Sequence, residues 1–151
     1  MKNKSLVIVG VIVTLLAGIL NLNGQSPVEI RAAAATAVTG WKQMASPSGS
    51  PLWVAPDVSL TSADIERAEA RSTASGPAVA IVLSDSGARK MSALTAQQAD
   101  KPIALLLDGQ VIWAPIVRGA GIQKEALLTG GGPGGLTQAQ IDRLLTSFKA
   151  K

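Results

Sequence analysis

Residues 78–115, AVAIVLSDSGARKMSALTAQQADKPIALLLDGQVIWAP, decide the fold of this 151-residue chain. The first six residues are apolar and rich in β-branched side chains, which is typical of a buried strand and too short for a buried helix. Ser84, Asp85 and Ser86 follow, and side-chain oxygens of this kind cap the free N–H groups at the start of a helix. We therefore expect a strand and then a helix that ends before Pro102, because proline disfavours helical geometry in the residue before it.

Two further apolar runs follow the predicted helix. Residues 103–107 and 111–113 are apolar, and Asp108-Gly109 joins them. An Asp-Gly pair suits a type I′ turn, which needs positive φ at both central positions. The stretch therefore predicts a strand, a helix and a β-hairpin.

The composition excludes several classes of function. The chain contains no cysteine and no histidine, so disulfides, thiolate metal sites and the commonest general base are absent. Without Lys2 and Lys4, fourteen basic residues become twelve against ten acidic ones, and the net charge falls from +4 to +2. This is far from the dense basic patch of a nucleic-acid-binding protein. We expect no cofactor, no metal site and no nucleic-acid partner.

The first 25 residues have the features of a secretory leader or a membrane anchor. Lys2 and Lys4 precede an uncharged apolar run of fifteen residues, 6–20, in the order found in signal peptides. Counted on to Leu22, the run has seventeen residues, which is about the length of the shortest membrane spans. A cleaved signal and an uncleaved anchor both stay open. In either case we expect residues 26–151 to form one domain in the periplasm or cell envelope, which meets the membrane only through an uncleaved leader.

The segments on either side of the central stretch carry weaker signals. Residues 28–31 alternate apolar and charged side chains as a strand does, although the alanines up to residue 37 also suit a helix, and we favour a strand over residues 28–33. Two short strands are predicted at 41–44 and 52–55, around a loop dense in turn-forming residues.

Two capping-box patterns predict helix starts. Thr61 and Asp64 have this spacing within residues 60–67, and Thr137 and Gln140 repeat it before a final helix that reaches Phe148. The glycine run 130–135 precedes that final helix. No Lys-Ser or Lys-Thr follows it, so it predicts a connector and not a phosphate-binding loop.

Three motifs in this order resemble a known family: VAIVLSDSGARKMSALT, KPIALLLDGQVIWAP and LLTG. They are similar to the head subdomain of the first periplasmic domain of SecD, in the SecD/SecF protein-export family, over about residues 52–148. Residues and resemblance together predict an α+β fold, with a mainly antiparallel sheet and two to three helices packed on one face. The resemblance implies a part in proton-driven protein export. The family's transmembrane bundle has no counterpart in this sequence, so we expect a stand-alone exported module and not a pump.

Residues 114–125, APIVRGAGIQKE, are the best candidate for an interaction surface. The candidate partner-binding residues are Ile116, Val117, Arg118 and Ile122, apolar or charged side chains on a glycine-containing segment. These apolar side chains can equally fold back over the sheet. The partner implied by the resemblance is an unfolded or translocating polypeptide, or a component of the export machinery.

No residue has a clear catalytic role, so we expect a non-catalytic binding module. The alternatives are a small hydrolase that uses Ser86 and Lys90, four residues apart on the predicted helix, and a purely structural envelope protein. The hydrolase would need an oriented, desolvated base and oxyanion donors. A surface helix start offers neither of these. Capping alone explains a serine at this position.

Overall fold

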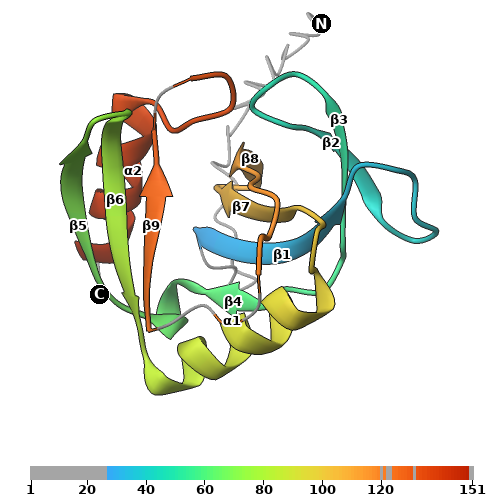
Figure 1. The fold of residues 1–151 in the computed structure, drawn as a ribbon, viewed down its shortest axis with the longest axis horizontal. Helices are drawn as coiled ribbons and strands as arrows, with labels where there is room; N and C mark the ends of the chain where they lie inside the picture. Colours follow the sequence, from blue (N-terminus) through green and yellow to red (C-terminus); the bar gives the residue numbers. More distant parts are fainter. Residues whose placement is uncertain (1–26, 120, 122–123, 131, 150–151) are drawn as a thin grey trace, which may run out of the picture.

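The computed structural model describes residues 27–119, 121, 124–130 and 132–149. The predicted leader and Ile122 lie outside the described residues. The described residues form nine strands, two α-helices and one 3-10 turn, and their arrangement is drawn in Figure 1. In chain order they are β1 (Val28–Ala34), β2 (Lys42–Ala45), β3 (Pro51–Val54), β4 (Leu60–Thr61), η1 (Ser62–Asp64), β5 (Ile65–Thr73), β6 (Gly76–Leu83), α1 (Asp85–Gln97), β7 (Ile103–Leu107), β8 (Gln110–Trp113), β9 (Glu125–Thr129) and α2 (Gln138–Lys149).

The strands form two sheets in which every named pair is antiparallel. The larger sheet has the order β2-β3-β1-β7-β8, with β4 beside β1, and the smaller has the order β5-β6-β9. Helix α1 contacts β4 and β6 where the two sheets approach each other, and α2 contacts β5 and β6 (Figure 1). The expected α+β class with mainly antiparallel strands is confirmed, with two helices and with the strands divided between two sheets.

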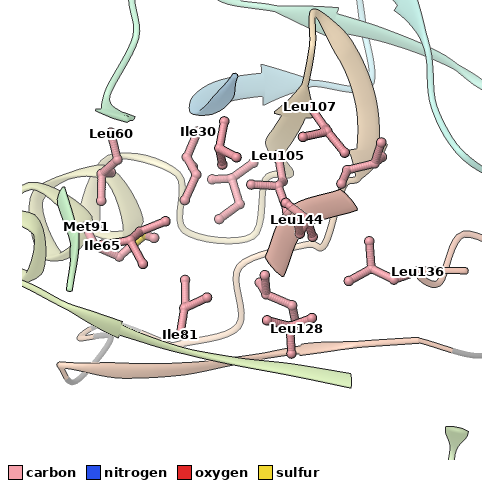
Figure 2. Packing of buried hydrophobic residues seen from close by; sticks show 14 of the residues in the cluster. Ile30, Leu60, Ile65, Ile81, Met91, Leu105, Leu107, Leu128, Leu136 and Leu144 are labelled. Carbon is pink, nitrogen blue, oxygen red and sulfur yellow. The ribbon is translucent and has the colours of Figure 1, made fainter. Parts of the chain in front are cut away.

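The main hydrophobic core lies between the two sheets. Figure 2 shows Ile30, Leu105 and Leu107 of the larger sheet opposite Ile81 and Leu128 of the smaller one. Met91 of α1 and Leu144 of α2 belong to the same cluster, so both helices are fixed to it. A second cluster contains Ala33, Leu52, Val54, Ala104, Leu106 and Val111.

The central stretch folds as predicted, into β6, α1 and the β7–β8 hairpin. Ser84 caps α1, because its hydroxyl oxygen accepts a hydrogen bond from the N–H of Gly87. Asp108 and Gly109 have φ values of 50° and 80°, as a type I′ turn requires. The strands predicted at 28–33, 41–44 and 52–55 are present as β1, β2 and β3, and the final helix is α2.

The helix predicted at 60–67 is wrong. The capping box itself forms, with the Asp64 carboxylate accepting from the N–H of Thr61 at 3.0 Å, but it closes only the single turn η1. From Ile65 onward the chain pairs with β6 as a nine-residue strand. The capping signal acts on one turn only, and pairing with β6 across the short turn at residues 74–75 determines the structure after it.

We expect Gly109→Val to lower the free energy of unfolding by about 1–3 kcal/mol, because a β-branched residue resists a positive φ. A Cβ at this position meets nothing within 4 Å, so the expected loss is backbone strain and not a clash. Gln110→Val is the matched control, since it adds the same side chain at an exposed strand position. Urea denaturation of the two variants measures the difference, and equal stabilities would contradict the turn.

Candidate functional site

An apolar cleft opens between the two sheets, with a volume of about 400 Å³. This lies within the range of roughly 300–1,000 Å³ that is usual for ligand pockets. Its inner surface is formed by Ile30, Ile81, Met91, Ile103, Leu105 and Trp113. Its two walls are the segment 115–119, which follows β8, and residues 125–128 of β9. The cleft therefore lies between β9, in the smaller sheet, and the segment that follows β8 of the larger sheet.

The first wall is held by main-chain hydrogen bonds to the segment that enters β7. The N–H of Ile103 donates to the carbonyl of Pro115 at 3.0 Å, and the N–H of Val117 donates to the carbonyl of Lys101 at 2.9 Å. These bonds flank an antiparallel bridge between Pro102 and Ile116. The wall is therefore an extended strand-like segment.

Three of the four candidate partner-binding residues line this cleft, and Ile122 lies outside the described residues. The side chains of Ile116 and Arg118 are exposed, Ile116 by 50%. Val117 has only 8% of its surface exposed and packs in the main core. The extended backbone explains this difference, because neighbouring side chains point to opposite sides of it. The exposed apolar contact on this wall is thus Ile116.

The sequence does not predict the second wall, β9. Leu127 at its centre is 47% exposed, whereas Leu128 is buried in the core. Five residues between two glycine-containing segments give only a weak strand signal, and pairing with β6 is what defines them. The alternation of Glu125, Leu127 and Thr129 with Ala126 and Leu128 is the one local feature that indicates this strand.

A small charge cluster ties the start of β9 to the start of α1. The ammonium group of Lys124 donates to Asp85 Oδ1 at 2.9 Å, and Glu66 Oε2 lies 3.8 Å away. The hydrogen bond from Lys124 holds the pKa of the Asp85 carboxyl below its ordinary value, and the same bond raises the pKa of Lys124. One end of the β9 wall is thereby linked to the helix cap.

The cleft continues past Ile116 into a second hollow of about 480 Å³. The two share Trp113, Pro115 and Ile116. The second hollow is bounded by the β2–β3 turn, by Thr129 at the end of β9 and by residues 133–135. The two hollows therefore adjoin at Ile116, and their linings together include residues 125–129 of β9.

The helix start at Ser86 does not form a serine–lysine site. Lys90 donates to Asp64 Oδ1 at 2.8 Å, and Ser86 is exposed on the first turn of α1. A nucleophile needs a base directed at it, and the ammonium group of Lys90 is directed at a carboxylate instead. The structure does not support the hydrolase alternative.

The described part of the chain contains neither a metal cluster nor a long apolar helix. No group of three potential metal-binding side chains is found among those residues. No helix that they form is long and apolar enough to cross a membrane.

The chain is similar to SecDF in sequence pattern and in fold. The family model for the SecDF P1 head subdomain matches residues 37–141. A crystal structure of SecDF in a super-membrane-facing form aligns with 80% of this chain at 23% identity and a TM-score of 0.58, and this chain covers 18% of it. A structure of SecDF, described as a membrane component that enhances protein export, aligns with 85% at 25% identity and a TM-score of 0.56, and 66% of it is covered. No curated protein sequence matches significantly.

Proposed function

The chain belongs to the family of the SecDF P1 head subdomain, and on that premise we propose that it is a non-catalytic module that assists protein export. It works outside the cytoplasm, in the periplasm or cell envelope. Its partner is a polypeptide in transit or a component of the export machinery. One of the two similar structures is described as enhancing protein export.

The apolar cleft between the sheets is the observation that supports this proposal. Four large apolar side chains are exposed in the described part of the chain: Val38, Val58, Ile116 and Leu127. Two of them, Ile116 and Leu127, lie on the opposite walls of the cleft. A polypeptide that has not yet folded exposes apolar side chains of its own, and burying them against these walls favours association.

The size of this surface suits a weak and reversible contact. Complete burial of one such side chain contributes roughly 1.5–3 kcal/mol, and association costs take up a large part of the total. A module that assists export must also release the chain. Modest affinity from a few apolar contacts fits that requirement.

We expect Ile116→Ser to weaken binding of an unfolded polypeptide about fivefold. Half of Ile116 is already buried in the free protein, so burial of the exposed half contributes only about 1 kcal/mol to the binding free energy. Fluorescence anisotropy of a labelled, reduced and unfolded protein, titrated with the full chain, measures this affinity. The variant should melt close to the wild-type temperature, since its side chain is half exposed.

Val58→Ser is the matched control for this experiment. Val58 is 39% exposed, similar to Ile116, and it does not line the cleft or its continuation. Its replacement should leave the affinity unchanged. Equal affinities for the wild type and both variants would contradict the proposed site.

A further inference from the structure

We propose that the bound polypeptide is held as an added β-strand on the free edge of β9. This inference rests on the proposed function, because it specifies how a polypeptide in transit is recognised in the same cleft. The recognition is mainly through the backbone, so the substrate class is any extended segment with small or apolar side chains at alternate positions.

The main-chain hydrogen bonds show which residues of β9 face its free edge. The N–H of Leu83 donates to the carbonyl of Lys124, and the N–H of Gly130 donates to the carbonyl of Pro77, both at 2.7 Å. Residues 124 and 130 therefore direct their main-chain groups toward β6. This direction alternates along an antiparallel ladder, so Glu125, Leu127 and Thr129 direct theirs away from β6.

No other strand of the described residues pairs with this edge. The smaller sheet has the order β5-β6-β9, so β9 ends it. The N–H of Leu136 donates to the carbonyl of Thr129 at 3.5 Å, which occupies one end of the edge. Among the described residues, none is hydrogen-bonded to the N–H and C=O groups of Glu125 and Leu127 on this side, so an incoming strand can pair with them.

The opposite wall offers main-chain groups to the same space. Pro115 and Val117 use their main-chain groups to bind the segment that enters β7, so Ile116 between them directs its N–H and C=O the other way. In Figure 1 this wall stands between β9 and the connection from α1 to β7. An extended polypeptide in the cleft thus has Glu125 and Leu127 on one side and Ile116 on the other.

A comparison of the two edge strands of the smaller sheet supports the choice of β9. Edge strands are commonly protected from pairing by charged side chains. β5 carries four of them in nine residues, Glu66, Arg67, Glu69 and Arg71, and Glu69 pairs with both arginines at 3.1 and 2.9 Å. β9 carries only Glu125. The unprotected edge is therefore the one that borders the apolar cleft.

Strand addition also predicts how the side chains of the polypeptide are arranged. Leu128 of β9 faces the core and Leu127 is exposed, so the two faces of the sheet differ at this edge. Alternate side chains of an added strand would lie over the apolar lining of the cleft, and those between them would lie in solvent. Main-chain pairing gives the affinity and the apolar lining gives a loose preference, as in other cases of β-augmentation.

A proline at position 127 tests the hydrogen bonds directly. Leu127→Pro removes an N–H that faces the free edge, and it leaves the groups that pair β9 with β6 in place. Leu127→Ala is the matched control, because it shortens the same side chain and keeps the N–H. For the full chain and a lysine-flanked peptide that alternates valine and threonine, we expect the proline variant to bind at least tenfold more weakly than the alanine variant.

Two N-methylated analogues of the peptide test the same bonds from the other partner. One analogue is methylated at the valine amides and the other at the threonine amides, and strand pairing requires at least one of them to lose tenfold or more in affinity. This measurement stands even if Leu127→Pro fails to fold. Normal binding by both analogues, or by a folded proline variant, would overturn strand addition and leave polypeptide binding intact.

Other outcomes bear on the occupant of the edge. If the wild-type chain binds neither the peptide nor an unfolded protein, both the proposed function and the strand pairing are overturned. A dimer that light scattering detects without peptide, and that Leu127→Pro abolishes, would assign the edge to a second copy of the chain and overturn its assignment to an exported polypeptide.

Discussion

Leu144→Ala is expected to lower the free energy of unfolding by about 3–5 kcal/mol, the range for a buried leucine whose surroundings cannot collapse. Leu144 is 0% exposed in the middle of α2. Figure 2 places it between Leu105 and Leu107 of the larger sheet and Leu128 of the smaller one. Both sheets would have to shift to fill the space that the alanine leaves.

The matched control for this variant is the neighbouring residue. Leu145→Ala removes the same atoms from a side chain that is only partly buried against the same cluster. Its loss should be about 1 kcal/mol, because partly exposed surface contributes less. Urea denaturation of both variants gives the two values. Equal losses would show that α2 is not held against both sheets.

The sequence predicts the central part of the fold well because its signals are local. The cap at Ser84 and the Asp108-Gly109 turn each depend on the side chains and φ values of a few neighbouring residues. Such signals fix where a strand or helix begins and ends. They account for β6, α1 and the β7–β8 hairpin without knowledge of the rest of the chain.

The division into two sheets depends on which strands pair with β6, and the capping and turn signals used here do not report it. β5 begins at a capping box that predicts a helix, and β9 is five residues long. Both become strands because β6 lies between them and pairs with each. Tertiary context overrides local preference at these two places.

The candidate site shows the same limit. The sequence singles out residues 114–125 as a candidate contact surface, because apolar residues lie beside glycines there, and part of this segment forms the wall that contains Ile116. It does not separate Ile116 from Val117, which needs the extended backbone, and it does not reveal Leu127 on the facing strand. A cleft between two sheets exists only once both sheets are in place.

Gly87→Ala is expected to lower the free energy of unfolding by about 3 kcal/mol, at the upper end for overpacking a close contact. A Cβ on Gly87 would lie 2.3 Å from the carbonyl oxygen of Asp64. That oxygen cannot easily move, because it accepts the N–H of Ser84 at 2.9 Å, and the Asp64 carboxylate binds Thr61 and Lys90. The glycine is therefore required for α1 to pack on the η1 turn.

The sign of the effect distinguishes this contact from ordinary helix propensity. In an open helical position alanine is more favourable than glycine by about 1 kcal/mol, so without the contact Gly87→Ala would stabilise the protein. Ser86→Ala is the matched control, since it makes an alanine at an exposed position of the same turn and should change stability by less than about 0.5 kcal/mol. Chemical denaturation compares the two variants. A Gly87→Ala protein as stable as the wild type would mean that Asp64 does not hold the start of α1. The start of α1 is also where Asp85 binds Lys124 of the charge cluster.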